Sequence, residues 1–389
     1  MPRLKTVELF AGIGGFRLAC DAKGFETIWA NDLDPKACTV YRARFGHAAL
    51  REGDIRTLSG EIPDHDLLTG GFPCQPFSSA GKKSGIRDPR GTLFQTIVEI
   101  VRAHEPSFFV LENVKRLLSM EDGSHFATIL EALASLDYRI EWRVLNAMHF
   151  GLPQNRQRVV IVGTHQRALS SRRGDRVLLA SSEDLLALSD LERSIFLDGR
   201  RRWTAIESHA RRFPWWGIAL DGRFFGADLL AFTSASQMPS LNSILQDNHD
   251  VGPEFDFTDS TKDRLKDNVP VNRFVQGVQI LSNQGGGARM GYTIFGVDGV
   301  APTLTAATSR HYERYSIGGR FRRLTNVEYA RLQGFPDNHC REISVYDQYV
   351  LFGNAVPPPL ISWVLDRMRS SGASLPKQRT GQLALFYAS

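Results

Sequence analysis

The chain has 389 residues, of which 42% are hydrophobic and 23% charged. These proportions are typical of a globular protein with two or three domains and exclude a largely disordered chain. A formal net charge of +5 permits nucleic-acid binding without indicating it. Because there is no run of about 18 uncharged apolar residues and no signal-peptide pattern, neither a membrane span nor secretion is predicted. A cytoplasmic protein is expected.

The cysteines Cys20, Cys38, Cys74 and Cys340 lie far apart and show no CxxC spacing. Neither a disulfide framework nor a zinc cluster is therefore predicted. No metal site is expected elsewhere in the sequence.

Through about residue 165, short apolar runs alternate with helix-like stretches, which predicts a mostly parallel sheet covered by helices on both faces. The predicted strands are Thr6–Phe10, Glu26–Trp29, Leu67–Leu68, Phe108–Leu111, Arg139–Leu145 and Val159–Val162. The predicted helices are Gly15–Lys23, Pro35–Phe45, Leu93–Ala103 and His125–Leu136. Residues 1–165 are therefore expected to form a doubly wound α/β domain.

From residue 166 to 317 the periodicity breaks down, which predicts a second, smaller and less regular domain. Its basic segment Arg193–Arg223 interleaves arginines with aromatic residues. Either a solvated face over a small core or a DNA-facing surface explains this pattern. Residues 318–370 regain helical patterning and are expected to return to the first domain, and residues 371–389 are expected to be a loose tail.

The first motif is VELFAGIGGF (Val7–Phe16), an apolar strand that runs into a glycine-rich turn and a helix. Such glycines let the backbone approach a ligand and offer N–H donors. Asp32 follows Gly12 by twenty residues, a spacing at which a carboxylate can accept hydrogen bonds from ribose hydroxyls. Asp54, in GDIRTL, could meet an adenine amino group. A nucleoside cofactor is favoured, although a dehydrogenase-type Rossmann turn or a structural turn would explain the glycines alone.

The second motif is TGGFPCQPFS (Thr69–Ser78), in which Cys74 occupies a loop of glycine and proline. Nearby cations would favour its thiolate form and so indicate a nucleophile; they are Lys82, Lys83, Arg87 and Arg90. The remaining cysteines are predicted to be small buried hydrophobic residues.

Two further motifs carry charged residues at the ends of apolar strands. In FVLENV (Phe109–Val114), Glu112 stands at the carboxyl end of a strand, where ligands bind in open α/β sheets. In PQNRQR (Pro153–Arg158), Arg156 and Arg158 lie on one face of an extended segment. Either motif alone could be a structural ion pair.

Taken in order, these motifs and two later ones, RLTNVEYARLQGFP (Arg323–Pro336) and GNAVPPP (Gly353–Pro359), resemble the bacterial DNA (cytosine-5-)-methyltransferases of restriction–modification type. The resemblance runs from residue 7 to about 365. It implies a Rossmann-like, S-adenosylmethionine-dependent methyltransferase domain, into which the irregular region is inserted as a target-recognition domain. It also implies that the segment around Asn354 packs beside the first glycine motif.

The resemblance implies a mechanism in which the Cys74 thiolate attacks C6 of a cytosine flipped out of duplex DNA. Glu112 would contact N3, Arg158 would hold O2, and Arg156 would brace the carboxylate of Glu112. C5 then takes the methyl group from S-adenosylmethionine, leaving S-adenosylhomocysteine, and loss of the C5 proton and of Cys74 restores the ring.

The resemblance also implies two sets of binding residues. The expected cofactor-binding residues are Phe10, Ala11, Gly12, Gly14, Gly15, Asp32, Leu33, Asp54, Ile55, Pro73, Leu93, Asn354 and Ala355. Leu33 departs from the aromatic residue that some relatives place against the adenine. The expected DNA-binding residues are Gln75, Ser78, Lys82, Arg90, Arg289 and Thr303.

Arg289 follows a run of glycines in NQGGGAR and could pair with guanine, although a plain surface turn would explain the same residues. Double-stranded DNA is the expected partner of a monomer, with a restriction endonuclease as a functional companion. Three alternatives are a transfer-RNA cytosine methyltransferase of the same fold, a silent DNA-binding protein and a nucleotide-dependent oxidoreductase. The loop sequence around Cys74 argues against the first, the intact Cys74, Glu112 and Arg158 against the second, and the later motifs against the third.

Overall fold

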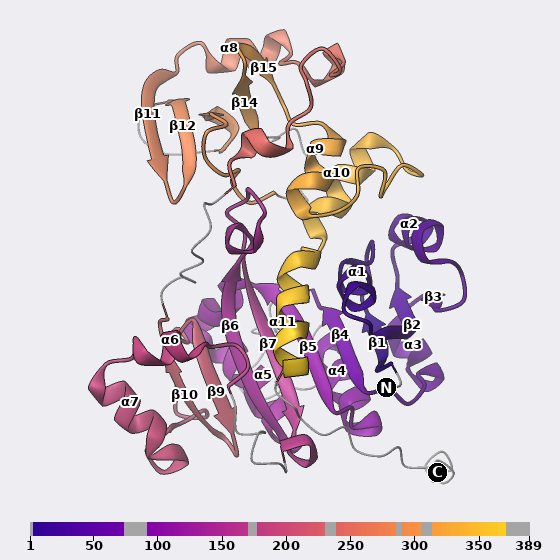
Figure 1. Cartoon of the computed structure of the whole chain (residues 1–389), viewed down its shortest axis with the longest axis vertical. Coiled ribbons are helices and arrows are strands. Elements are labelled where there is room, and N and C mark those ends of the chain that lie inside the picture. Colours follow the sequence, from indigo (N-terminus) through magenta and orange to yellow (C-terminus); the bar gives the residue numbers. More distant parts are fainter. Residues whose placement is uncertain are drawn as a thin grey trace.

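A computed structural model describes residues 3–73, 92–169, 177–229, 239–284, 290–304 and 313–370. Within these residues the strands form two sheets, which lie at opposite ends of the molecule (Figure 1). The larger sheet has ten strands in the order β3-β2-β1-β4-β5-β7-β6-β9-β10-β8. Its strands are β1 (Lys5–Leu9), β2 (Glu26–Asp32), β3 (Leu50–Glu52), β4 (Leu67–Gly71), β5 (Phe108–Val114), β6 (Tyr138–Asn146), β7 (Gln157–His165), β8 (Thr204–Ala205), β9 (Trp216–Leu220) and β10 (Arg223–Ala227).

The first five of these strands in space pair in parallel, and β7 pairs antiparallel with both β5 and β6. Strand β5 shows why the apolar runs are continuous: Phe109 and Leu111 face one hydrophobic core, whereas Phe108 and Val110 face another. A sheet that is buried on both faces needs apolar residues at successive positions.

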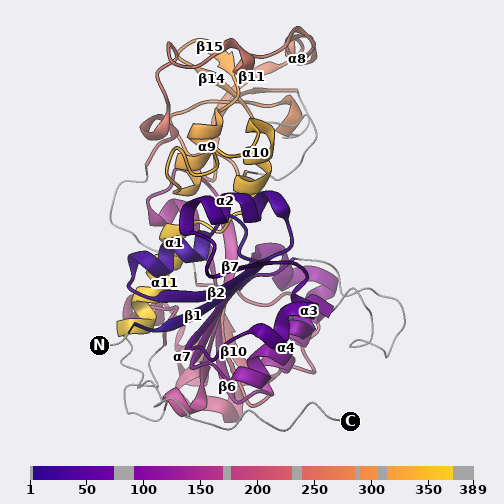
Figure 2. The same cartoon turned by 90° about the vertical axis from the view of Figure 1, so that its right-hand side faces the viewer.

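Helices cover both faces of the large sheet, as the view along its edge shows (Figure 2). Helices α4 and α5 pack on one face, whereas α1 and α11 pack on the other. This arrangement confirms the expected doubly wound α/β fold. The described helices are α1 (Gly15–Ala22), α2 (Pro35–Phe45), α3 (Ile55–Leu58), α4 (Thr92–His104), α5 (Ser124–Ala134), α6 (Ser182–Leu186), α7 (Asp190–Leu197), α8 (Asp259–Leu265), α9 (Asn326–Gln333), α10 (Val345–Asn354) and α11 (Pro358–Ser370).

The large sheet continues past residue 165, the expected end of the first domain. Strand β9 pairs with β6, and β10 and β8 extend the same sheet. The boundary expected at residue 166 is therefore wrong as a limit of the sheet, because the hairpin β9–β10 supplies backbone partners to the open edge of β6.

The basic segment Arg193–Arg223 lies mostly in this extension. Three of its aromatic side chains are buried in the core, namely Trp203, Phe213 and Trp216. Several of its arginines form ion pairs at the surface, namely Arg200 with Asp221, Arg202 with Asp198 and Arg212 with Asp228. These contacts favour a solvated face over a core rather than a DNA-facing surface.

The smaller sheet has five strands in the order β11-β12-β13-β14-β15. They are β11 (Val269–Val275), β12 (Val278–Asn283), β13 (Ile294–Phe295), β14 (Arg314–Ile317) and β15 (Arg320–Arg322). Strand β15 extends this sheet beyond residue 317, so the second expected boundary is also displaced. Helices α9 and α10 lie between the two sheets and share a hydrophobic core with the smaller one.

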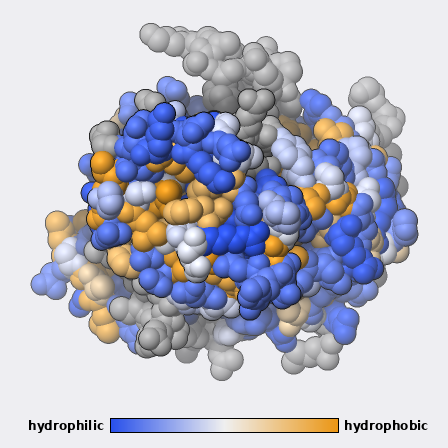
Figure 3. All heavy atoms as spheres, turned by 90° about the horizontal axis from the view of Figure 1, so that it is seen from above, coloured by the Kyte–Doolittle hydropathy of each residue, from blue (hydrophilic) through white to orange (hydrophobic). Residues whose placement is uncertain are grey.

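Seen from the end that carries the smaller sheet, the surface is mainly hydrophilic, with hydrophobic areas between (Figure 3). The edge strand β11 is exposed along nearly its whole length, and Phe274 keeps 59% of its surface accessible. Among the described residues, no helix has the length and apolar character needed to cross a bilayer.

The segment that leads into the returning helix α11 approaches the glycine motif closely at Gly15. A Cβ atom at Gly15 would lie 2.3 Å from the carbonyl oxygen of Val356, which belongs to backbone and cannot rotate away. Alanine usually stabilises a helix relative to glycine, so the two effects have opposite signs at this position.

We expect Gly15→Ala to lower the free energy of unfolding by about 1–3 kcal/mol, the usual effect of overpacking. Denaturant unfolding of this variant measures it. Gly60→Ala is the matched control, because a Cβ there meets no heavy atom within 4 Å. Equal stabilities of the two variants would contradict the close packing at Gly15.

Candidate active site

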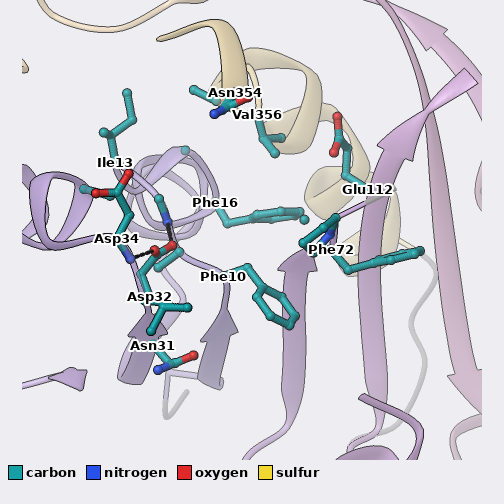
Figure 4. Close-up of a pocket in the computed structure, with 18 of the residues that line it drawn as sticks. Phe10, Ile13, Phe16, Asn31, Asp32, Asp34, Phe72, Glu112, Asn354 and Val356 are labelled. Carbon is teal, nitrogen blue, oxygen red and sulfur yellow. Dashed lines mark hydrogen bonds between the residues drawn. The ribbon is translucent and has the colours of Figure 1, made fainter. Parts of the chain in front are cut away.

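A pocket of about 760 Å³ opens where β1, β2, β4 and β5 end, beside the junction of α10 and α11. Parallel strands present their carboxyl ends at one edge of a sheet, where ligands of open α/β folds bind. Figure 4 shows Asp32 and Asp34 on one side and Glu112 on the other, with Phe10 and Phe16 between them. The predicted residues that line the pocket are Phe10, Ala11, Gly12, Gly15, Asp32, Leu33, Asp54, Ile55, Pro73, Leu93, Glu112, Arg156, Arg158, Asn354 and Ala355.

The glycine turn is held open by Asp32. One carboxylate oxygen of Asp32 accepts a hydrogen bond from the Gly12 N–H at 2.7 Å, and the other accepts from the Asp34 N–H at 2.8 Å (Figure 4). Gly12 has φ of +54°, and a Cβ atom there would project into open space. The turn therefore leaves open space above its backbone, which a ligand can fill.

Leu33 and Asp54 also line the pocket. The Leu33 side chain is 66% exposed and offers an apolar surface to a ligand. Asp54 caps α3 by accepting a hydrogen bond from the Arg56 N–H at 2.9 Å. The Arg56 guanidinium, which hydrogen-bonds to the Asp54 side chain, also lowers the pKa of that carboxyl, so Asp54 is ionised at neutral pH.

The turn is also fixed from behind by residues from the C-terminal part of the chain. The buried ring of His339 is 2.7 Å from the carbonyl oxygen of Ile13 through Nε2, which can donate in the neutral tautomer.

A Cβ atom at Gly14 would collide with the ring of Phe45. Gly14 itself is not among the residues that line the pocket, so its part is to let this turn pack against α2.

At the other end of the pocket, Glu112 forms an ion pair with Arg158, with 2.9 Å between Oε1 and Nε. Glu112 is 8% exposed. Burial raises the pKa of its carboxyl, and the charges of Arg158 and then Arg156 only partly offset this effect. Glu112 therefore keeps its proton to a higher pH than an ordinary glutamate does. This property suits a group that donates a proton to a bound ligand.

The expectation that Arg156 braces Glu112 is wrong. Its guanidinium donates instead to the carbonyl oxygens of Gly353 and Ala355, both at 2.9 Å, and to that of Leu304 at 3.3 Å. Arg158, two residues further along the same face, forms the contact with Glu112 instead. Arg156 therefore joins the strand β7 to the wall of the pocket around Asn354.

Cys74 lies outside the described residues, as do Gln75, Ser78, Lys82, Arg90 and Arg289. Pro73, the last described residue before Cys74, lines the pocket. The preceding carbonyl oxygen, that of Phe72, accepts a hydrogen bond from the buried Asn113 side chain at 3.0 Å. Asn113 thus fixes the exit of β4 beside Glu112.

Sequence analysis did not single out Asn113 as a site residue, although it stands next to Glu112. Several other pocket residues were not predicted either, among them Ile13, Phe16, Asn31 and Val356. Thr303, expected to bind DNA, does not line the pocket, and its hydroxyl donates to the Asn155 carbonyl oxygen at 2.6 Å.

The other cysteines behave as the sequence predicts. Cys20, Cys38 and Cys340 are buried and unpaired. Burial raises the pKa of the Cys38 and Cys340 thiols to about 12, so neither is a nucleophile at neutral pH. Within the described ranges, no group of three or more histidine, cysteine or acidic residues is arranged to hold a metal ion.

Comparisons with known proteins bear on the whole described chain. Residues 4–370 match the family described as C-5 cytosine-specific DNA methylase. The Type II methyltransferase M1.ScrFI of Lactococcus lactis subsp. cremoris is 32% identical over 372 residues, which cover 94% of this chain and 78% of that protein. The Type II methyltransferase M.HhaI of Haemophilus parahaemolyticus is 30% identical over 372 residues, which cover 95% of each.

Among solved structures, the S. pombe Dnmt2 methyltransferase matches with a TM-score of 0.61 and 16% identity, covering 95% of this chain and 100% of that one. A crystal structure of a putative DNA modification methyltransferase from an E. coli prophage matches with a TM-score of 0.56 and 21% identity, covering 94% and 99%. At these identities the structural matches concern the fold.

Proposed function

The chain belongs to the C-5 cytosine-specific DNA methylase family and is a DNA (cytosine-5-)-methyltransferase, and from this premise we propose how it works. It transfers the methyl group of S-adenosylmethionine to C5 of a cytosine that is flipped out of a specific duplex sequence. Cys74 forms a transient covalent bond to C6. The 5-methylcytosine that it forms protects host DNA in a restriction–modification or related defence system.

The observation that carries this proposal is the pairing of Glu112 with Arg158 at the buried end of the pocket. Attack of the Cys74 thiolate on C6 breaks the C5–C6 double bond and moves negative charge through the ring towards N3. Glu112, whose pKa burial raises, can hold a proton at N3. Arg158 is paired with Glu112, and we assign it to the O2 atom, which neighbours N3 on the same ring.

The pocket also fits an adenosine cofactor with a sulfonium group, which supplies the methyl group when bound. Gly12 leaves open space for it, and the exposed Leu33 offers an apolar surface for adenine. Each oxygen of Asp32 accepts one backbone hydrogen bond and keeps a lone pair for a ribose hydroxyl. We assign the nucleoside end to this side and the cytosine to the side of Glu112.

Asn354 ends α10 at the pocket and is exposed there. We expect Asn354→Ala to weaken binding of S-adenosylhomocysteine about three- to tenfold, as the loss of one or two hydrogen bonds does. Calorimetric titration measures the change, with Asn242→Ala, exposed in the region of the smaller sheet, as the matched control. Unchanged affinity would remove Asn354 from the cofactor site.

For the nucleic-acid partner we propose double-stranded DNA, bound between the two sheets by a monomer. The smaller sheet and the segments around it form the target-recognition part, which begins beyond β10 rather than at residue 166. Arg289 and the loop that follows Cys74 stay predicted contacts. We also propose pairing with a restriction endonuclease and action on cellular DNA in the cytoplasm, which the type of the relatives supports.

The direct test is conversion-based sequencing of DNA from a methylation-free bacterial host that expresses the chain, with Cys74→Ser alongside. A discrete sequence that carries 5-methylcytosine only with the wild-type chain supports reaction and specificity together. Unmodified DNA from a soluble, cofactor-binding protein would overturn the proposal, and sequencing of the RNA from the same cells then tests the alternative substrate.

A further inference from the structure

The segment Pro153–Arg156, just before β7, touches the smaller domain and the cofactor pocket at once. Its backbone is joined to the segment 301–304: the Asn155 N–H donates to the Ala301 carbonyl oxygen at 2.8 Å, and the Ala301 N–H donates to the Pro153 carbonyl oxygen at 2.7 Å. The Thr303 hydroxyl adds a third bond, to Asn155. The two segments therefore form a short parallel bridge.

The side chain of Gln154 continues this bridge inward. It is fully buried, and its amide oxygen accepts a hydrogen bond from the Leu304 N–H at 3.2 Å. Its amide nitrogen lies 3.2 Å from the Leu332 carbonyl oxygen and 3.2 Å from the amide oxygen of Gln333. Gln154 thus connects the segment 301–304, which we call the recognition segment, to α9.

Gln333 carries the connection to the pocket. It is also fully buried, and its amide nitrogen donates to the carbonyl oxygen of Phe352. Phe352 directly precedes Gly353 and Asn354, which line the pocket, and Arg156 holds the carbonyl oxygens of Gly353 and Ala355 from the other side.

The hydrogen bonds allow only one orientation of each side-chain amide. Leu304 can only donate through its N–H, so the oxygen of Gln154 must face it, and the nitrogen of Gln154 must face Gln333. The same reasoning turns the nitrogen of Gln333 towards Phe352. Because all these groups are shielded from water, a shift of the segment at Leu304 would leave buried polar atoms unsatisfied unless the pocket wall moved with it.

We propose that Gln154 is a positioning residue that couples target recognition to cofactor binding, by fixing the segment 301–304 against the pocket wall at 352–355. The inference rests on the proposed binding of DNA and S-adenosylmethionine. The inference does not concern the binding of either ligand alone. It concerns the coupling between the two binding events, which by linkage is the same whichever ligand binds first.

The test is calorimetric titration of S-adenosylhomocysteine into the full chain, with and without a saturating duplex that carries the sequence found methylated in the host. For the wild type, the duplex is expected to tighten binding about tenfold, within the range of usual coupling. In Gln154→Met, which keeps the shape but loses the amide, this factor is expected to fall below about threefold.

Gln348→Met is the matched control. Gln348 is buried in α10 and makes hydrogen bonds to Ile343 and Asn326, which join neither the recognition segment nor the pocket. Its loss should cost comparable stability but leave the coupling factor unchanged.

If Gln154→Met does not fold, Thr303→Val removes the outermost bond of the bridge at a half-buried position, and a reduced coupling factor is again expected. The factor is a ratio measured at saturating DNA, so it does not depend on DNA affinity. Wild-type coupling retained in the variant, or lost equally in Gln348→Met, would overturn the inference. A wild-type chain that binds neither ligand would instead overturn the proposed function.

Discussion

Replacing Cys74 with serine is expected to lower the methylation rate by about 10⁴-fold or more while leaving DNA affinity largely intact. A serine hydroxyl is not ionised at neutral pH, whereas a cysteine thiol forms its nucleophilic thiolate far more readily. Without the bond to C6, the C5 carbon of the aromatic ring is too weak a nucleophile to take the methyl group. Removing a nucleophile costs several orders of magnitude in comparable enzymes.

Transfer of a radioactive methyl group to duplex DNA measures the rate, and a filter or mobility assay measures DNA binding. Cys38→Ser is the matched control, because that thiol is buried, has a raised pKa and lies in α2 outside the pocket. Methylation that persists in Cys74→Ser would exclude Cys74 as the nucleophile. Loss of activity in both variants with loss of folding would point to a structural effect.

The strands of the first part could be predicted because they are buried on both faces. Runs such as Phe108–Leu111 have no polar interruption, and the helix Pro35–Phe45 begins at a proline with Asp34 as its cap, so its bounds are those predicted. Strand β3 was missed, since only Leu50 of its three residues is buried and no periodicity arises.

The extension of the sheet was also missed, although a signal was present. Asp221 and Gly222 connect β9 and β10 and both have positive φ, the backbone that a tight hairpin turn requires. The many arginines and tryptophans around this turn obscured the alternation of its strands. A hairpin prediction there would still not have shown that β9 pairs with β6, because that contact is remote in sequence.

For the site, the motifs indicated which residues gather in the pocket but not which ones touch. The partners of Arg156 are carbonyl oxygens of residues 148, 197 and 199 positions later in the sequence. Backbone acceptors carry no signature in the side-chain sequence. The same applies to His339, whose acceptor is the carbonyl oxygen of Ile13.

Replacing Glu112 with glutamine is expected to lower the rate of methyl transfer about 10²–10³-fold, the usual contribution of a positioned acid. Glutamine keeps the shape and can donate a hydrogen bond, but it has no carboxyl proton to hold at N3, and it loses the ion pair with Arg158. Cofactor affinity should change little, because Asp32 and the glycine turn lie on the opposite side of the pocket (Figure 4).

The pH dependence separates this role from a structural one. Since burial raises the pKa of Glu112, its protonated form persists to higher pH than in an ordinary glutamate, and the rate should fall as the pH rises through that pKa. The native state also binds this proton more tightly than the unfolded chain does, so the contribution to the free energy of unfolding is present at low pH and lost over the same rise. Glu112→Gln should remove this fall in rate and flatten the loss of stability. An unchanged fall in rate with rising pH in the variant would assign it to another group and exclude a protonated Glu112 from the reaction.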